Sequence, residues 1–412
     1  MNRPKIISLY TGAGGLDYGF EAAGFQTAVA VEMDHTCCET LRANRSWPVI
    51  EGDILNVSSE RILREAGLDV GEADVVIGGP PCQPFSKSGY WAAGDARRLT
   101  DPRASTLHAY MRVIEDTQPQ AFLLENVPGL AFNGKDEGLQ LLFDLLRKIN
   151  KRTGTSYRPV VRQLCAADFG VPQVRHRVFV VAARDGTQFE FPKATHISRE
   201  ELEKLEIKPS GLEPHRTAWD ALADVRARDP GHLEPTGKWA DLLPSIPEGE
   251  NYLHHTDRGG GLPLFGWRRR YWTFLLKLAK DRPSWTIQAQ PGPSTGPFHW
   301  DNRLLSMREL CRLQTFPDDV EIVGDQRAIQ RQLGNAVPSL LAEVLARAIR
   351  IQLLGQKAPR GGLKLLPPDR SPAPAPTQPA SVPKAYRHLA GRHEAHPGTG
   401  QGYRAQAQQP AN

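Results

Sequence analysis

The chain has 412 residues, of which 40% are hydrophobic and 24% charged, and its formal net charge is +5. This length allows two or three globular domains, and this composition excludes a fully disordered chain. No stretch reaches the ~20 consecutive apolar residues of a membrane-spanning helix, and residues 1–5 lead into a short apolar run without a signal-peptide core. We therefore expect a soluble protein of the cytoplasm that makes no membrane contact.

The positive charge is concentrated near the end of the chain. Residues 355–412 contain eight Lys/Arg and two Asp/Glu, so residues 1–354 carry a net charge of −1. Bulk charge therefore gives no argument for nucleic-acid binding, which has to be argued from where basic residues lie. The five cysteines are odd in number and form no CxxC pair, so we expect neither disulfide bonds nor a metal site.

Five short apolar runs alternate with segments of helical length, at 5–9, 27–31, 73–77, 121–124 and 178–182. This alternation predicts an α/β fold in which helices cover a parallel sheet, with residues 1–185 as the first domain. From 186 to 302, prolines, tryptophans and charged residues replace the pattern and predict a second, smaller, loop-rich domain. Helical spacing returns at 307–314 and 340–354, so we expect residues 303–354 to rejoin the first domain.

The last segment, residues 355–412, is rich in Pro, Ala, Gln and Gly and has almost no aromatic residues. Such a composition buries too little apolar surface to offset the entropy of ordering. We therefore expect a disordered tail, which can be removed after Gly355 without loss of activity.

A glycine-rich turn follows the first apolar run, with the sequence Tyr10-Thr11-Gly12-Ala13-Gly14-Gly15. Strand, glycine turn and helix in this order are typical of a nucleoside-binding unit, and Glu32 at the end of the second strand is placed to accept hydrogen bonds from a ribose. Asp17 occupies the third glycine position of the dinucleotide pattern, which favours a smaller adenosine-containing ligand. Taken alone, the motif is also compatible with an ordinary turn.

A cysteine lies in a rigid loop after the strand at 75–77, in the segment Gly78-Gly79-Pro80-Pro81-Cys82-Gln83-Pro84-Phe85-Ser86. The carboxyl ends of parallel strands form the ligand-binding edge of such sheets. A thiol held there by prolines indicates a positioned thiolate nucleophile, whereas Cys165 and Cys311 lie in periodic segments and are expected to be core residues.

Polar residues follow other strands of the predicted sheet. Glu125 and Asn126 end the strand at 121–124, and a partly buried carboxyl there is able to donate a proton; a helix-capping pair is the alternative. Gln173, Arg175 and Arg177 alternate along an extended segment, so they share one side and are able to engage a phosphate or a base carbonyl. A solvated edge strand is the alternative for these three.

Six motifs occur in the order found in DNA (cytosine-5) methyltransferases that use S-adenosylmethionine, and the chain resembles that family. They are the glycine turn, Pro-Pro-Cys-Gln at 80–83, Glu-Asn-Val at 125–127, Gln-x-Arg-x-Arg at 173–177, Arg-Glu-x-x-Arg-Leu-Gln-x-Phe-Pro at 308–317 and Gln-Leu-Gly-Asn-Ala-Val-Pro at 332–338. The chain departs from the family at Tyr10, which replaces a Phe, and at Ser8, which replaces a common Asp.

The resemblance implies a Rossmann-like domain that binds S-adenosylmethionine and a target recognition domain between Arg177 and Arg308. It also implies a monomeric modification enzyme of a bacterial restriction system, which acts on double-stranded DNA in the nucleoid. A cognate endonuclease would act on the same site without forming a stable complex. Recognition loops follow no general code, so the resemblance does not assign the base sequence of that site.

The resemblance also assigns roles to single residues. Cys82 would add to C6 of a flipped-out cytosine, with Glu125 at N3 and Arg177 at O2, and with Asn126 and Arg175 in support. The residues expected to hold S-adenosylmethionine are Tyr10, Gly12, Gly14, Gly15, Leu16, Glu32, Met33, Asp53, Ile54, Pro80, Asn335 and Val337. The residues expected to contact DNA are Gln83, Ser86, Gln173, Arg258, Arg268, Arg269 and Arg270.

The segment from Arg258 to Arg282 contains seven Lys/Arg and one Asp, interleaved with aromatic residues. We expect it to face DNA; the alternative is a solvated basic surface. Three other functions remain possible at this level. They are an enzyme of the same chemistry that acts on tRNA, a catalytically silent DNA-binding protein on the same scaffold, and a nicotinamide-dependent enzyme.

Overall fold

The computed structural model describes residues 3–81, 105–127, 137–205, 210–226, 233–268, 271–391 and 393. The chain divides into two compact units. We call residues 1–226, 281–290 and 306–373 the sheet unit, and residues 227–280, 291–305 and 374–412 the loop-rich unit. The first boundary therefore follows residue 226, later than the expected 185. Within the described residues, no helix has the length and apolar character needed to cross a membrane.

A seven-stranded sheet forms the centre of the sheet unit, in the order β3-β2-β1-β4-β5-β8-β6. The strands are β1 (Lys5–Leu9), β2 (Gln26–Glu32), β3 (Val49–Glu51), β4 (Val75–Gly78), β5 (Ala121–Asn126), β6 (Val160–Cys165) and β8 (His176–Ala183). All five predicted runs are strands of this one sheet, which confirms the predicted α/β class.

One strand runs against the predicted direction. The pairs from β3 to β5 are parallel, but β8 is antiparallel to both of its neighbours, β5 and β6. Only ten residues, 166–175, connect β6 to β8. A parallel crossover needs about a dozen or more, so this connection forces an antiparallel return.

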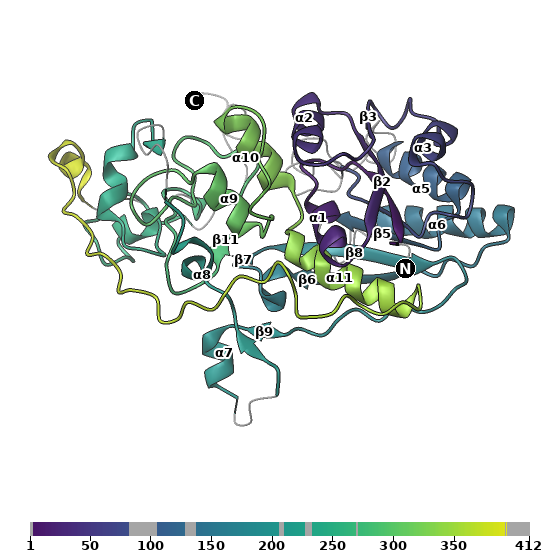
Figure 1. Cartoon of the computed structure of the whole chain (residues 1–412). Helices are drawn as coiled ribbons and strands as arrows, with labels where there is room; N and C mark the ends of the chain where they lie inside the picture. The colour runs from purple at the N-terminus through teal and green to yellow at the C-terminus, as the bar shows by residue number, and fades with distance from the viewer. Residues whose placement is uncertain are drawn as a thin grey trace, which may run out of the picture. The chain divides into compact units, whose positions relative to one another are not determined.

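The helices are α1 (Gly15–Ala22), α2 (His35–Asn44), α3 (Ser59–Ala66), α5 (Ser105–Thr117), α6 (Glu137–Thr153), α7 (Arg199–Glu203), α8 (Ala218–Leu222), α9 (Met307–Leu313), α10 (Gln326–Asn335) and α11 (Ser339–Gln352). Of these, α1 and α11 cover one face of the sheet, and α3, α5 and α6 cover the other (Figure 1). Ile7 packs with residues of α3, α5 and α6, whereas its neighbour Ile6 packs with residues of α1 and α11. Because adjacent side chains of a strand point to opposite faces, each strand contributes to two hydrophobic cores.

The predicted helices at 307–314 and 340–354 correspond to α9 and α11. Figure 1 shows α11 beside α1, and the two helices are in contact. The expected apolar face of α11 is confirmed: Leu340, Leu341 and Leu345 are completely buried against the sheet. Short pairs complete the sheet unit, β7 (Gln173–Val174) with β11 (Ser284–Trp285) and β9 (His196–Ile197) with β10 (Glu213–Pro214).

The loop-rich unit has a small aromatic core of its own. Its buried residues include Leu243, Tyr252 and Phe298, and Trp239 and Phe274 pack against them. Three short 3₁₀ helices, Ala240–Ser245, Tyr252–His255 and Lys384–Leu389, surround this core. Prolines and glycines prevent long regular elements here, as the sequence predicts.

The segment after Gly355 differs from the expected disordered tail, because residues 355–391 have defined positions. Leu363, Leu365 and Leu366 pack against the α1–α11 side of the sheet. The fully buried carboxylate of Glu343 accepts hydrogen bonds from the backbone N–H groups of Lys364 (2.9 Å) and Leu365 (3.0 Å). A few apolar and hydrogen-bonding positions therefore hold a segment whose average composition suggests disorder.

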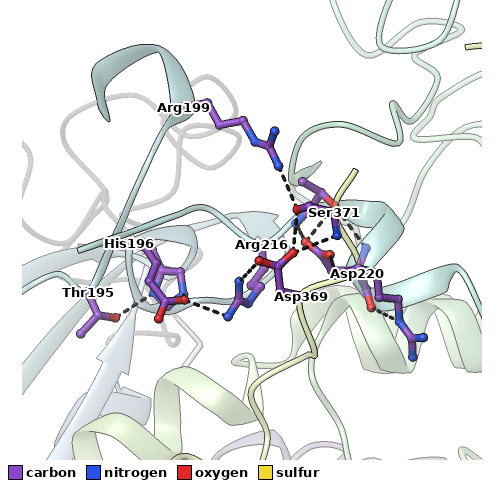
Figure 2. A network of polar contacts seen from close by, with 10 residues as sticks. Thr195, His196, Arg199, Arg216, Asp220, Asp369 and Ser371 are labelled. Atoms are coloured by element: carbon purple, nitrogen blue, oxygen red, sulfur yellow. Dashed lines mark hydrogen bonds and ion pairs between the residues drawn. The ribbon is translucent and has the colours of Figure 1, made fainter. Parts of the chain in front are cut away.

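Figure 2 shows the polar contacts that hold the next part of this segment. Asp369 pairs with Arg216 at 3.5 Å, and Ser371 accepts a hydrogen bond from Arg199 at 3.1 Å. The backbone N–H of Arg370 donates to the buried carboxylate of Asp220 at 2.6 Å. We call residues 355–373 the C-terminal strap of the sheet unit.

The following residues belong to the loop-rich unit. Tyr386 is buried there, with its ring stacked on Trp239 at a centroid distance of 5.5 Å. Its hydroxyl donates to the carbonyl of Lys238 at 2.7 Å. A tyrosine with both a stacking partner and a hydrogen-bond partner is a fixed part of a core.

Candidate active site

The candidate site lies at the carboxyl ends of β1, β2, β4 and β5. The chain leaves β1 toward β2 on one side, and β4 pairs on the other side of β1. At such a reversal the connections leave in opposite directions and open a crevice, where open α/β sheets bind their ligands. The glycine turn follows β1 at this point, and Gly79 and Pro80 follow β4. The glycine turn and the residues Gly79 and Pro80 therefore lie at one edge of the sheet, as the strand pattern predicts.

Glu32, at the end of β2, organises the glycine turn. One of its carboxylate oxygens accepts a hydrogen bond from the N–H of Gly12 at 2.7 Å, and the other accepts from Met33 (2.9 Å) and Asp34 (2.8 Å). A carboxylate offers about four acceptor positions, so one remains for a ligand hydroxyl. A Cβ built on Gly12 would meet no atom within 4 Å. An open position beside an acceptor carboxylate fits a ribose-containing cofactor.

A buried carboxyl lies beneath this turn and was missed as a site residue. Asp17 is fully buried and accepts hydrogen bonds from Ser8 Oγ (2.9 Å) and Thr27 Oγ1 (3.1 Å). Ser8 in turn accepts from Thr11 Oγ1 at 3.0 Å. Burial raises the pKa of Asp17 to about 7, although these hydroxyls oppose the shift. The two unusual residues of the motif, Ser8 and Asp17, are therefore partners.

The other predicted cofactor residues lie in three kinds of environment. Tyr10 is half-buried, with a backbone φ of 53° and its hydroxyl donating to the carbonyl of Thr106 at 2.7 Å. Asp53 is half-buried and accepts from the N–H of Leu55 at 3.0 Å. The buried ones are Gly14, Gly15, Leu16, Ile54, Pro80 and Val337, and the exposed ones are Met33 and Asn335. Among the described residues, no group of His, Cys, Asp and Glu is arranged to hold a metal ion.

The second half of the site is an ion pair between neighbouring strands. Arg177 Nε lies 2.8 Å from Glu125 Oε1, and the two side chains are only 13% and 12% exposed. Burial raises the pKa of Glu125, while the charges of Arg177 and Arg175 act in the opposite direction. A Cβ at Gly79 would lie 2.8 Å from Glu125 Oε2, so the missing side chain leaves room for the carboxyl group. The acid is thus positioned directly beside the segment that leads to Cys82.

Asn126 has a structural partner at this edge. Its side-chain amide donates to the carbonyl of Pro80 at 3.2 Å and accepts from the N–H of Val127 at 2.8 Å. It therefore ties the end of β5 to the residues after β4, and its expected supporting role at the base stays a prediction. Cys82, Gln83 and Ser86 lie outside the described residues.

Gln173 and Arg175 are placed differently from expectation. Both are fully buried. The Gln173 amide donates to the carbonyl of Leu313 and accepts from the N–H of Ile287, both at 3.2 Å. A side chain with no exposed surface and a satisfied amide has no means of contacting DNA, which corrects the predicted role of Gln173.

Arg175 donates to the carbonyls of Gly334 (2.6 Å) and Ile287 (3.2 Å), and its Nε has no partner among the residues that the structure describes. Burial lowers the pKa of Arg175, as does the charge of Arg177. It therefore fixes the start of β8 to the segment at 332–338. This position supports the arrangement of Arg177 without reaching a substrate.

The segment from Arg258 to Arg282 offers fewer basic side chains for DNA contact than its composition suggests. Arg258 is exposed, with its guanidinium 4.3 Å from the ring centre of Trp267, and Arg268 is half-buried. Lys277 is buried, donates to the carbonyl of Ile246 and has a pKa lowered to about 8 by burial; Lys280 pairs with Glu248. Arg269 and Arg270 lie outside the described residues. Two of the seven basic residues, Lys277 and Lys280, are thus used inside this unit.

Comparisons with known proteins agree with this geometry. A family model described as C-5 cytosine-specific DNA methylase matches residues 4–350. The type II methyltransferase M.SacI of Streptomyces achromogenes is 42% identical over 371 residues, which cover 84% of this chain and 93% of that protein. M.NgoFVII of Neisseria gonorrhoeae is 33% identical over 353 residues, with 84% and 87% covered. The structure of the Entamoeba histolytica methyltransferase EhMeth has a TM-score of 0.58 at 15% identity and covers 86% of this chain and 99% of that one, which supports the fold.

The match extends over most of the chain and confirms the resemblance inferred from the six motifs. A methylase needs a methyl donor, and membership of this family implies that the donor is S-adenosylmethionine. The chain belongs to the C-5 cytosine-specific DNA methylase family and is a DNA (cytosine-5-)-methyltransferase.

Proposed function

We propose that this enzyme methylates C5 of a cytosine that is rotated out of a specific duplex DNA sequence, through a covalent bond between Cys82 Sγ and C6 of the base. The observation that carries this mechanism is the buried Glu125–Arg177 pair beside Gly79 and Pro80, three and two residues before Cys82. It supplies an acid and a cation at the place to which the sequence brings the thiol.

The chemistry requires both groups because cytosine C5 is a weak nucleophile. Addition of the Cys82 thiolate to C6 moves an electron pair toward N3, where Glu125 donates a proton, and C5 becomes enamine-like. C5 then takes the methyl group from a sulfonium, whose sulfur leaves as a neutral thioether. Loss of the C5 proton to a base, return of the N3 proton to Glu125 and breakage of the C6–S bond restore the neutral aromatic base and the thiolate. Burial raises the pKa of Glu125 and favours the protonated form that this step needs. Arg177 stabilises the charge that develops at O2.

S-adenosylmethionine, when bound, supplies an electrophilic methyl group on a sulfonium. We assign its binding to the turn from Tyr10 to Leu16 and to Glu32, whose free acceptor position suits a ribose hydroxyl. The remaining assigned residues are Met33, Asp53, Ile54, Pro80, Asn335 and Val337. The Ser8–Asp17 pair keeps the turn in place from below.

Rotating the cytosine out of the stack costs a few kcal/mol, which contacts to the flanking duplex must offset. We assign these contacts to Arg258, Arg268, Arg269 and Arg270, together with Gln83 and Ser86 near the cysteine. The relatives M.SacI and M.NgoFVII are named type II methyltransferases. We infer from the family resemblance that the enzyme protects DNA as a monomer in the bacterial nucleoid, alongside an endonuclease that acts on the same site.

The test is methyl transfer from radiolabelled S-adenosylmethionine to duplex DNA and, separately, to tRNA. We expect transfer to DNA alone, and none by Cys82→Ser, which removes the nucleophile but keeps the size of the side chain. Transfer to tRNA alone would show that the substrate is tRNA and would contradict the proposed DNA substrate. Transfer to neither would identify a silent scaffold that binds DNA without modifying it.

A further inference from the structure

An arginine is stacked on a tryptophan at the surface of the loop-rich unit. The Arg258 guanidinium carbon lies 4.3 Å from the Trp267 ring centre, and the Arg258 side chain is exposed. In the described part of the chain, no carboxylate lies within ion-pair distance of it. The guanidinium therefore keeps its hydrogen-bond donors for a partner outside the chain, while the ring limits its orientation.

The loop that carries Arg258 is closed at its base. The carbonyl of His255 accepts from the N–H groups of Leu264 (2.9 Å) and Phe265 (3.0 Å). The hydroxyl of Tyr252 donates to the carbonyl of Arg268 and accepts from its N–H at 3.1 Å. Residues 256–268 are thus anchored at both ends to buried residues of the unit.

The interior of the loop is fixed as well. The buried ring of His255 contacts Ser245 Oγ at 2.8 Å and the carbonyl of Leu262 at 3.0 Å. A Cβ at Gly259 would lie 2.2 Å from the carbonyl oxygen of His254, so the backbone crosses there at a distance that only glycine allows. Two more glycines follow. Next to Arg258 the loop therefore has no side chains over three residues. Such a thin loop is able to enter a groove of DNA.

We propose that Arg258 reads a guanine of the recognition sequence, with its two parallel N–H donors on O6 and N7 of the base. The proposal rests on the proposed function and adds the base that this residue selects. Bidentate contact with guanine requires a planar fork held in one orientation, and the Trp267 stack provides it. A phosphate also accepts this fork, but it is bound as well by Lys, by hydroxyl groups and by backbone N–H groups, so a phosphate contact does not depend on the stack or the rigid loop.

The test uses a pool of duplexes with randomised bases around the methylated cytosine, followed by bisulfite sequencing of the products. Wild type, Arg258→Ala, Arg258→Lys and Trp267→Ala are compared on the same pool. We expect Arg258→Ala to lose discrimination at one guanine position by roughly 5- to 150-fold, with the other positions unchanged. Arg258→Lys keeps the charge but lacks the planar fork, and Trp267→Ala leaves the fork free to turn. Both variants should therefore lose discrimination at the same guanine position, to a smaller extent than Arg258→Ala.

Lys238→Ala is the matched control. Lys238 is also exposed and also stacked on a tryptophan of this unit, 4.8 Å from the ring centre of Trp239. It should leave the sequence profile unchanged. If Arg258→Ala instead weakens binding equally for all sequences, and the slope of log K against log salt concentration falls by about one, Arg258 contacts a phosphate. That result would overturn the proposal.

Two results separate failure of this inference from other failures. If wild type methylates no duplex in the pool, the proposed function itself fails. If Arg258→Ala is unfolded by circular dichroism, Arg258→Lys and Trp267→Ala decide, and an unchanged guanine preference in both overturns the proposal.

Discussion

Arg177 Nε and Glu125 Oε1 lie 2.8 Å apart across the antiparallel pair β8 and β5, and neither side chain is more than 13% exposed. The strand that runs against the rest of the sheet is therefore the one that brings the cation to the acid. Both groups are held in place by the fold before any substrate arrives, which is the preorganisation that stabilises charge in a transition state.

Glu125→Gln should lower kcat by about 10²- to 10⁴-fold, because the amide keeps the shape of the carboxyl group but has no proton to give to N3. Binding of S-adenosylmethionine, measured by calorimetry, should stay within a few-fold of wild type. The control is Glu115→Gln, a half-buried carboxylate of α5 paired with Arg152 outside the site, which should leave kcat unchanged. A Glu125→Gln enzyme with wild-type kcat would remove the acid from the mechanism.

Arg177→Ala should leave Glu125 buried without its cation and lower the free energy of unfolding by about 3 kcal/mol at pH 8. The pKa of Glu125 is already raised by burial, so its contribution to stability is present below the pKa of the unfolded chain and decreases as pH rises through the folded pKa. Loss of Arg177 raises that folded pKa further. The destabilisation, measured by urea unfolding, should therefore be smaller at pH 5 than at pH 8, and the opposite trend would contradict this assignment.

Asp17→Asn tests the buried carboxyl under the glycine turn. The pKa of Asp17 is about 7 in the folded chain, against 3.8 without burial, so its favourable contribution is complete below about pH 4 and is lost as pH rises through 7. The variant does not titrate. Its unfolding free energy relative to wild type should rise by roughly 4 kcal/mol between pH 4 and pH 8. A pH-independent difference would mean that the carboxyl ionises normally in the folded protein.

Three truncations test the C-terminal strap. Ending the chain after His393 should change nothing, and ending it after Ala373 should remove Tyr386 from the loop-rich core. Ending it after Gly355 also removes Leu363, Leu365 and Leu366. This loss of buried apolar surface should lower the free energy of unfolding by about 3 kcal/mol more. Equal melting temperatures for all three chains would contradict this loss of stability. The expectation from composition, that the segment is dispensable for activity, stays a prediction that the same three chains test.

The sequence predicted best what local patterns determine. The β1 glycine turn, Glu32 and Glu125 lie where strand periodicity and motif order place them, because parallel strands bring their carboxyl ends to one edge. The direction of β8 was predicted wrongly, although the ten-residue connection before it contained the signal.

Side-chain partners that are distant in sequence were harder to predict. Alternation indicated that Gln173 and Arg175 share a side, but did not reveal that residues 287, 313 and 334 cover that side. The hydrogen bond between Ser8 and Asp17 could not be predicted, because the sequence shows these residues only as two separate departures from known motifs. Composition averaged over residues 355–412 concealed the few leucines and carboxylate contacts that fix the strap, since ordering depends on particular positions.

The central claim is that Cys82 forms a transient bond to the target cytosine. Incubation with S-adenosylmethionine and a duplex carrying 5-fluorocytosine at the methylated position blocks loss of the C5 substituent and should trap the adduct. We predict a stable enzyme–DNA complex whose peptide map places the link at Cys82, and no complex with Cys82→Ser. An enzyme that methylates ordinary duplex DNA but yields no adduct on this substrate, or yields one at another residue, would contradict the account.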